Sequence, residues 1–434
     1  MEKYIGNKKS ILEGIENFLS DKGIESGLII DAFSGTTNVG QYFKQRGYSI
    51  ISNDINDFSY IFGKVYIQNN EFPQYTHIIK EIIKRGFIID DDAIETSTKY
   101  IKRKLDGEKI FSKGYFEQVN YGNNIRPLLI VLQYLNSLTI SDLSPNELLF
   151  YNYYTVYGDN SSYRSARGTE GKRNYFTSDN AKKIGRIIET IKKWYMEESI
   201  SEMEFYILLC ALIEEVTLNA NVNGTFHDFN RSKLYPNALS PLSLKPMMIN
   251  IYENSSSDYF ITKVDSNELY NDCNFNSLLN KYQESVLYVD PPYNFRQYSA
   301  YYHMLNFIAI YHTIDDPIEY ANGFNYVRGQ NMKNNFNSQY CYKDKFIDAM
   351  EDLIKNIKSR HVVISYYDEN NHWNHGKKIV SLEGRKEILN IFSRIDSISS
   401  YDEAPFVIPR VNYQSRSGEH KKQIDELVFY GRRD

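Results

Sequence analysis

The sequence is poor in cysteine and contains no long apolar run. Its 3 cysteines in 434 residues, Cys210, Cys273 and Cys341, lie far apart and include no Cys-x-x-Cys pair. This spacing supplies neither a disulfide framework nor a cysteine-based metal site, so we expect no metal. No stretch reaches the roughly 18 apolar residues that a membrane helix needs, so we expect no membrane partner. The polar first residues lack a secretory signal, which predicts a cytoplasmic protein.

Positive charge is also scarce overall, because the formal net charge is -5. A nucleic-acid-binding protein needs local positive surface rather than a global excess. Between residues 161 and 186, seven basic residues stand against two acidic ones. We therefore interpret this segment as a candidate nucleic-acid contact, with phosphate or base contacts from Arg164, Arg167, Lys172 and Arg173.

Strand and helix patterns alternate near the start of the chain. An apolar run over 27–31 is followed by small residues and then by a helical pattern that extends through Gln45. A second apolar run over 48–54 precedes a helical pattern over about 57–66. This alternation predicts an α/β fold with an open, doubly wound, Rossmann-like sheet. Later segments have strand character as well, namely 259–265, 286–290, 361–366 and 426–430.

The alternation stops between residues 68 and 201, where mostly helical patterns follow one another. We therefore predict a catalytic domain made of 1–67 and 202–434, interrupted by an inserted helical domain over 68–201. The segment 315–345 is a candidate second insertion that contacts nucleic acid.

Four of the expected strands end in an acidic residue. An acid at such a place is commonly a turn or helix cap. Ligands of open α/β sheets, however, bind beyond the carboxyl ends of the strands, where several such acids would meet. These candidate ligand-binding acids are Asp31, Asp54, Asp265 and Asp290.

The turn after the first strand argues against two common nucleotide loops. Gly35 and Gly40 have the spacing of a phosphate-binding loop, but Gln41 and Tyr42 replace its lysine and hydroxyl residue. The dinucleotide pattern Gly-x-Gly-x-x-Gly is missing too. What remains is a turn of small residues that a ligand can approach closely. Asp54 is placed to accept hydrogen bonds from ribose hydroxyls, so the pattern favours a nucleoside ligand without phosphates.

The strongest motif follows the strand at 286–290 and reads Asp290-Pro291-Pro292-Tyr293. Consecutive prolines have nearly fixed φ and stiffen the turn. The Asp290 carboxylate and the Pro291 carbonyl can then accept both N–H groups of an exocyclic amine, while the Tyr293 ring stacks on the base. Such acceptors draw the amine toward tetrahedral geometry in the transition state. These four residues are the candidate catalytic set for methylation of a planar amine, and without a Pro-Cys dipeptide cytosine-C5 chemistry has no candidate nucleophile.

The order of these motifs resembles the DPPY-type amino methyltransferases, specifically the D12-class, α-arranged, Dam-like N6-adenine-specific DNA methyltransferases. Residues 3–8 resemble the family motif that contacts the methionine part of S-adenosylmethionine. The stretch from Asp31 is similar to the family's Phe-x-Gly-x-Gly cofactor turn, with Thr37 in place of the second glycine. By this resemblance, Asp54 matches the family's ribose-binding acid, and Asp265 matches the acid that lies near the cofactor adenine. The resemblance thus implicates in cofactor binding Tyr4, Gly6, Lys8, Asp31, Phe33, Gly35, Asp54 and Asp265.

Other segments resemble a subset of the same family, including 291–303 with its Arg-Gln-Tyr sequence, 172–177 and 223–226. We add Arg296 and Tyr298 to the candidate DNA contacts. The resemblance implies an S-adenosylmethionine-dependent methyltransferase fold whose helical insertion is the target recognition region. It also implies double-stranded DNA as substrate, an adenine rotated out of the duplex, and a role in restriction-modification or host DNA marking. A cognate restriction endonuclease is a candidate partner.

Two other functions remain open from the residues themselves. The same grip on a planar amine would serve methylation of cytosine N4 or of a base in RNA. A catalytically silent subunit that only recognises DNA is a third reading, although the intact Asp290 and Tyr293 argue against it. The choice of adenine rests on the family resemblance.

Overall fold

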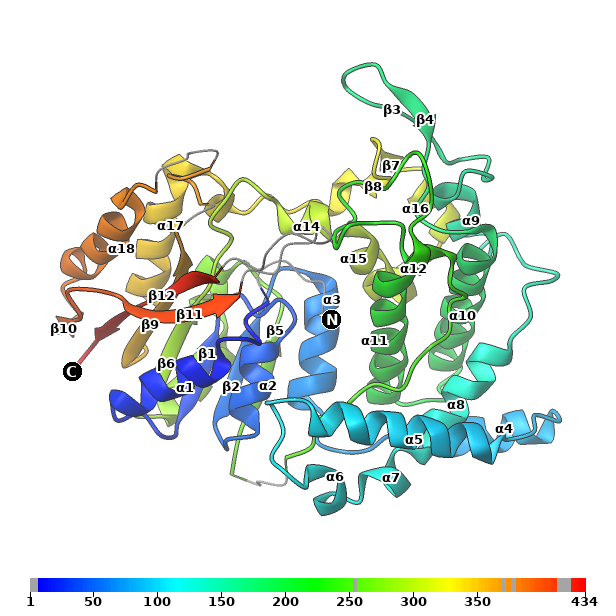
Figure 1. Ribbon diagram of the computed structural model, residues 1–434, viewed down its shortest axis with the longest axis horizontal. Coiled ribbons are helices and arrows are strands. Elements are labelled where there is room, and N and C mark those ends of the chain that lie inside the picture. The colour runs from blue at the N-terminus through cyan, green and yellow to red at the C-terminus, as the bar shows by residue number, and fades with distance from the viewer. Residues whose placement is uncertain (1–6, 253–255, 369–370, 376–379, 412–422) are drawn as a thin grey trace. The chain divides into compact units, whose positions relative to one another are not determined.

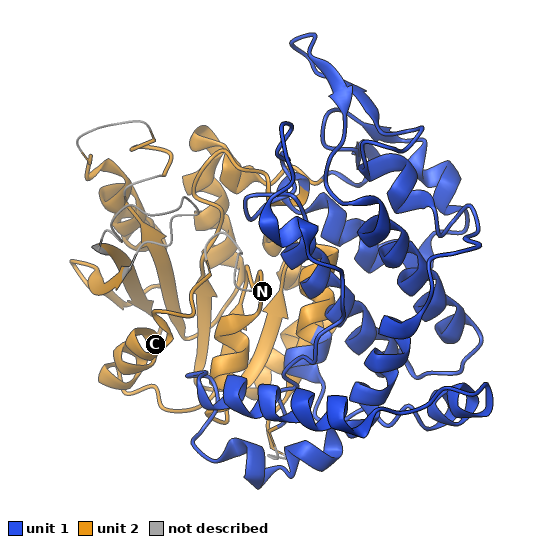
Figure 2. Cartoon of the chain, turned by 45° about the vertical axis from the view of Figure 1, so that its right-hand side comes forward, with its two compact units in different colours: residues 1–5, 64–251, 300–335 blue, residues 6–63, 252–299, 336–434 orange. Residues whose placement is uncertain are grey.

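A computed structural model describes residues 7–252, 256–368, 371–375, 380–411 and 423–434. These residues form two compact units (Figure 2). The helical unit consists of Lys64–Ile251 and Ala300–Asn335, and the sheet unit consists of 7–63, 252–299 and 336–434 within the described ranges. No helix of the described part is long and apolar enough to span a membrane.

The sheet unit is built on an 8-stranded sheet with the strand order β10-β12-β9-β6-β1-β2-β5, in which β11 also pairs with β12 (Figure 1). Strands β5, β2, β1, β6 and β9 are parallel, whereas β12 runs antiparallel to β9, β10 and β11. The strands are β1 Leu28–Asp31, β2 Ser49–Asn53, β5 Tyr259–Thr262, β6 Ser285–Val289, β9 His361–Tyr367, β10 Ser400–Tyr401, β11 Phe406–Val411 and β12 Gln423–Arg432. This topology confirms the predicted doubly wound α/β sheet.

The direction of chain winding reverses between β1 and β6. From β1 the chain adds β2 and then β5 on one side, and later returns to add β6 and β9 on the other side. β1 and β6 pair in register from Leu28 opposite Ser285 to Asp31 opposite Tyr288. Ligands of such sheets bind outside the carboxyl ends of the strands at this switch point. The fold therefore places the ends of β1 and β6 at the expected binding edge.

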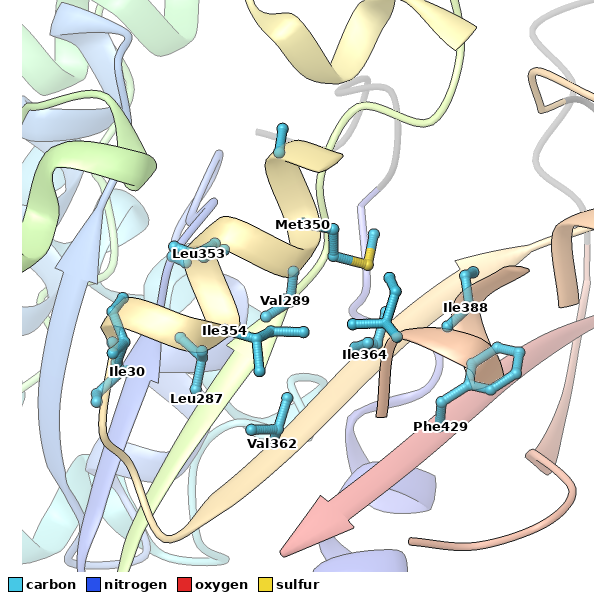
Figure 3. Packing of buried hydrophobic residues seen from close by; sticks show 14 of the residues in the cluster. Ile30, Leu287, Val289, Met350, Leu353, Ile354, Val362, Ile364, Ile388 and Phe429 are labelled. Atoms are coloured by element: carbon cyan, nitrogen blue, oxygen red, sulfur yellow. The ribbon is translucent and has the colours of Figure 1, made fainter. Parts of the chain in front are cut away.

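Alternate residues of these strands form one hydrophobic core (Figure 3). Ile30, Leu287 and Ile364 lie on one face of the sheet, as the period of two along a strand requires. The helices α13 (Cys273–Lys281), α17 (Lys343–Asn356) and α18 (Glu383–Arg394) supply the facing apolar side chains. The opposite face is covered in part by α1 (Leu12–Asp21), whose Phe18 ring lies 5.8 Å from the Tyr430 ring of β12. Helices α2 (Asn38–Lys44) and α3 (Asp57–Gly63) follow β1 and β2.

Two long helices organise the helical unit, and both begin at well-formed caps. Thr177 accepts a hydrogen bond from the Asn180 amide at the start of α10 (Ser178–Met196). Ser201 and Glu204 form a capping box at the start of α11 (Glu202–Asn219), which is buried almost all round. The other described α-helices are α4 Thr76–Lys84, α5 Asp91–Asp106, α6 Tyr115–Gln118, α7 Tyr121–Asn124, α8 Arg126–Ser137, α9 Leu149–Tyr154, α12 Pro236–Leu239, α14 Tyr298–Tyr301, α15 His303–Ile310 and α16 Pro317–Ala321.

Two short hairpins complete the helical unit. β3 (Ser162–Arg164) pairs with β4 (Glu170–Lys172), and this hairpin stands out from the helices of its unit (Figure 1). β7 (Phe324–Asn325) pairs with β8 (Gln330–Asn331). The sequence pattern predicted mostly helices between 68 and 201 and neither β3 nor β4, because a three-residue strand is too short to show a hydrophobic alternation.

The compact units differ from the domain boundaries predicted from the sequence. The helical unit extends past residue 201 to 251, because α11 packs along α10, and it takes in 300–335 as well. The predicted second insertion at 315–345 is split, since 336–345 belong to the sheet unit. Which unit recognises the substrate stays a prediction.

Candidate active site

Buried carboxylates end the two strands at the switch point. Asp31 is the last residue of β1 and is 2% exposed, and Asp290 directly follows β6 with a side chain that is 14% exposed. Burial, and next the negative charge of Asp290, raise the pKa of Asp31 well above its usual range. Burial likewise raises the pKa of Asp290. Negative charge at this edge is therefore costly without a cation.

Lys8 supplies a cation from the N-terminal segment. Its Nζ lies 2.9 Å from Oδ1 of Asp290, and it also donates to Glu426 of β12. Burial disfavours charge on this ammonium, but the Asp290 and Glu426 carboxylates outweigh burial and raise the pKa of Lys8. Lys8 is thus a charged group shared between two buried carboxylates.

Glu426 has two further partners besides Lys8. Ser365 Oγ donates to Glu426 Oε1 over 2.5 Å, and Arg410 Nε donates to Oε2 over 2.8 Å. Burial opposes the charge of Glu426, but Lys8 and Arg410 outweigh burial and hold its pKa below the ordinary value. Glu426 therefore stays ionised, and Asp290 is the carboxylate whose charge is less well stabilised.

The turn between β1 and α2 is tied to the end of β2. The Gly35 amide donates to Oδ2 of Asp54 over 2.8 Å, and the Asn56 amide donates to Oδ1 over 2.9 Å. Burial raises the pKa of Asp54 despite these bonds. Thr37 has a φ of 60°, so the position of the family's second glycine keeps a left-handed backbone without a glycine. Gln41 supports this conformation by donating to Thr37 Oγ1 over 3.0 Å.

Asp265 and Phe33 lie at the same edge of the sheet. Asp265 follows β5, caps the short helix Ser266–Asn271 and accepts a 3.1 Å hydrogen bond from the Asn267 amide. Burial raises its pKa. The Phe33 ring is half-buried and meets the Tyr340 ring edge-on at 4.9 Å, and the Tyr340 hydroxyl donates to Asn267 Oδ1. An aromatic wall therefore stands beside the acids.

The predicted catalytic motif continues along this edge. The half-buried Tyr293 ring lies edge-on to Tyr366 at 5.8 Å and 6.0 Å from the Lys8 ammonium. Beyond it, Arg296 and Tyr298 are half-buried. The fold thus gathers Lys8, Asp31, Phe33, Gly35, Asp54, Asp265 and Asp290–Tyr293 at one end of the sheet, whereas Tyr4 and Gly6 lie outside the described residues.

The candidate DNA contacts of the helical unit divide into exposed and buried residues. Arg164 has a side chain that is 75% exposed and lies 3.5 Å from Glu170 across the β3–β4 hairpin. Arg167 and Lys172 are exposed, and Lys172 also donates to the Gly158 carbonyl. These side chains are available to phosphate, and their role in DNA binding stays a prediction.

Arg173 is different, because it is only 2% exposed. Its guanidinium donates to backbone carbonyls of two segments. One segment precedes the β3–β4 hairpin and supplies the carbonyls of Tyr153 and Asn160, and the other contains the β7–β8 hairpin and supplies those of Phe324, Tyr326 and Val327. This burial is at odds with the predicted DNA contact. Arg173 instead fastens the base of the β3–β4 hairpin to the β7–β8 hairpin.

Comparison with known proteins agrees with this geometry. A family model described as D12 class N6 adenine-specific DNA methyltransferase matches residues 4–333. The chain belongs to this family. It is 29% identical over 430 residues to the modification methylase StsI of Streptococcus sanguinis, covering 99% of this chain and 51% of that protein. It is 28% identical over 435 residues to the type II methyltransferase M.FokI of Planomicrobium okeanokoites, covering 100% of this chain and 53% of that protein.

The chain therefore spans about half the length of these curated relatives. A further relative is matched over most of its own length. The type II methyltransferase M.NlaIII of Neisseria lactamica is 25% identical over 400 residues, which cover 92% of this chain and 90% of that protein. No solved structure matches the chain.

Methyltransferases of this family use S-adenosylmethionine, which supplies an electrophilic methyl group when bound. The described residues fit a ligand that carries sulfonium and ammonium groups, because a cation would stabilise the charge of Asp31, whose pKa is raised by burial and next by repulsion from Asp290. Asp54 suits the ribose hydroxyls, and the half-buried Phe33 suits an apolar contact. The described residues that would hold the ligand are Lys8, Asp31, Phe33, Gly35, Asp54 and Asp265.

Sequence reasoning missed the residues that surround Lys8. The strand containing Glu426 was predicted, but no role was given to the acid within it. A glutamate directly before the apolar run Leu427-Val428-Phe429-Tyr430 was a readable signal, because a buried acid needs a cationic partner. Its partners Ser365 and Arg410 carried no signal of their own.

Arg173→Met should destabilise the helical unit, because it leaves several buried carbonyls without a donor. We expect a loss of about 2–4 kcal/mol in the free energy of unfolding, measured by denaturant titration. Arg164→Met is the matched control and should change stability by less than about 0.5 kcal/mol. Equal, small effects of the two substitutions would contradict the structural role of Arg173.

Proposed function

We propose that this chain transfers the methyl group of S-adenosylmethionine to N6 of an adenine rotated out of duplex DNA. The observation that carries the proposal is the buried Asp290 carboxylate, paired with Lys8 and followed by Tyr293 at the switch point of the sheet. Membership of an adenine-specific family supports adenine as the base.

The chemistry asks the protein to make a poor nucleophile reactive. The lone pair of an adenine N6 amine is delocalised into the ring. The Asp290 carboxylate and the Pro291 carbonyl would accept its two N–H groups and draw the nitrogen toward tetrahedral geometry. Tyr293 would hold the base by stacking, and the base must leave the duplex to reach this depth. Because no covalent enzyme intermediate is needed, the absence of a nucleophilic cysteine from the motif fits the proposal.

DNA contacts are proposed mainly for the exposed basic residues of the β3–β4 hairpin, Arg164, Arg167 and Lys172. An exposed hairpin with several cations can follow a phosphate backbone without being part of the unit's core. Arg296 and Tyr298 are proposed as contacts near the catalytic motif, because they follow it directly in the chain.

The biological setting is part of the proposal. The relatives named as type II or modification methylases support a role in restriction-modification. A cognate restriction endonuclease would then be a functional partner, and the enzyme would act in the cytoplasm on cellular DNA.

Asp290→Ala should abolish methyl transfer, because the amine loses its charged acceptor. The assay follows tritium from labelled S-adenosylmethionine into duplex DNA, with digestion to nucleosides to identify the product. We expect N6-methyladenine from the unmodified protein and a rate at least about 100-fold lower in the variant, of the order that loss of one positioned hydrogen-bonding group costs. Cofactor binding, measured by calorimetry, should stay within about threefold.

Asp348→Ala is a matched control, since Asp348 lies on α17 and is exposed. It should leave the rate unchanged. Label in N4-methylcytosine would mean that the substrate base is cytosine and not adenine. Label in RNA but not in DNA would mean that the substrate nucleic acid is RNA. No transfer by the unmodified protein would favour the silent recognition subunit.

A combined Arg164→Gln, Arg167→Gln and Lys172→Gln variant should bind DNA more weakly at low salt. Each lost phosphate contact should reduce the slope of log K against log salt by about 0.9. Fluorescence anisotropy with a labelled duplex between about 50 and 200 mM salt measures both quantities. An unchanged slope would remove the hairpin from the DNA interface.

A further inference from the structure

Glu426 is a fully buried acid in the antiparallel part of the sheet, one strand beyond β9. Its side chain is 0% exposed, and it pairs across the ladders with Tyr367 of β9 and Ile408 of β11. Ser365 and Arg410 lie two residues along those strands, which puts them diagonal to Glu426 and on its face of the sheet. The pairing of the strands therefore fixes the Glu426 carboxylate as an acceptor between the Ser365 hydroxyl of β9 and the Arg410 guanidinium of β11.

The ladder also fixes where this acceptor points. β6 and β9 pair in parallel with Val289 opposite Ile364, so Asp290 follows at the level of Ser365. Lys8 spans the gap between Asp290 and Glu426 and contacts both carboxylates. A lysine has a flexible stem and could turn its ammonium elsewhere, but a buried glutamate on its far side holds it in one position.

We propose that Glu426 is a positioning residue that holds the Lys8 ammonium against Asp290 and sets how firmly Asp290 keeps its negative charge. The inference rests on the proposed function, in which Asp290 accepts a hydrogen bond from the amine. Asp290 must be ionised for that, yet must not be locked into an exclusive ion pair. Sharing Lys8 with Glu426 meets both requirements.

The charged and titratable groups around this network come from several elements. Lys8 belongs to the N-terminal segment, Glu426 to β12 and Arg410 to β11. Asp31 ends β1, while Tyr288 and Tyr293 flank Asp290 in the chain. All of them act electrostatically on Asp290 or are acted on by it: Lys8, Asp31, Tyr288, Tyr293, Arg410 and Glu426.

The signs of the expected changes follow from these charges. Glu426 repels negative charge on Asp290, so neutralising it while Lys8 keeps its place should lower the pKa of Asp290. The positive charge of Arg410 favours the ionised form of Asp290, and its guanidinium donates to one oxygen of Glu426. Neutralising Arg410 should therefore raise the pKa of Asp290. A role limited to folding would give no such opposite pair of shifts.

The experiment uses Glu426→Gln and Arg410→Gln in the full chain. Glutamine keeps an oxygen that can accept from Lys8 and Ser365, so Glu426→Gln preserves the shape of the network. Carbon-13 NMR of labelled aspartate carboxyl groups follows the titration of Asp290, whose signal is assigned by its loss in Asp290→Asn. We expect the Asp290 pKa to fall by about one unit in Glu426→Gln and to rise in Arg410→Gln.

Methyl transfer to duplex DNA, measured against pH, is the second readout. The acidic limb of the kcat profile should move in the same direction as the Asp290 titration in each variant, while KM for S-adenosylmethionine stays within about twofold. Glu284→Gln is the matched control. Glu284 also pairs with two residues at the start of β9, Arg360 and His361, but it precedes β6 and lies at the other end of these strands. It should move neither readout.

Shifts of the Asp290 titration in the same direction in both variants, or in neither, would overturn the inference. If Glu426→Gln fails to fold, the direction of the shift in Arg410→Gln decides alone. Opposite NMR shifts without any methyl transfer by the unmodified protein would sink the proposed function and leave the network intact. Normal methyl transfer with an unchanged Asp290 titration in both variants would overturn the role of Glu426 and leave the proposed function standing.

Discussion

Parallel strands that end at one edge of a sheet bring their terminal side chains together, and in this protein those side chains are acids. Asp31 and Asp290 end neighbouring strands, so their charges repel in a buried place. Lys8 is shared between Asp290 and Glu426, and Arg410 also donates to Glu426. The arrangement leaves this edge short of positive charge, which is what a sulfonium ligand and an amine with N–H donors both supply.

The rest of the sheet unit holds the acids of this edge in place. The core of β1, β6 and β9 against α17 and α18 fixes the strand register, and the register decides which acids meet. The antiparallel strands β11 and β12 add Arg410 and Glu426 from the far end of the chain. The helical unit carries an exposed basic hairpin, β3–β4, whose base is held by the buried Arg173. Under the proposed function, the chemistry would belong to the sheet unit and the phosphate contacts to this hairpin of the helical unit.

Local patterns predicted much of this arrangement and failed where partners are distant. The strands ending in Asp31, Asp54 and Asp290 were readable because apolar runs and their flanking acids are contiguous in sequence. Lys8 was expected to contact the cofactor, yet its partner Glu426 lies 418 positions away, and no local pattern pairs them. Arg173 lies in a basic segment and was expected to face DNA, but three of the carbonyls that accept from it, those of Phe324, Tyr326 and Val327, are about 150 positions distant. Pairings of that kind follow from tertiary packing.

Proton release on cofactor binding tests most directly whether the strand-end acids form the cation site. Calorimetry of S-adenosylmethionine binding at about pH 6.5, repeated in buffers of different ionisation enthalpy, counts the protons exchanged. Because burial and repulsion raise the pKa of Asp31 and Asp290 in the free protein, a bound cation should lower them and release protons. S-adenosylhomocysteine, which lacks the sulfonium charge, should release fewer. Equal proton release with both ligands, or proton uptake with S-adenosylmethionine, would contradict the account.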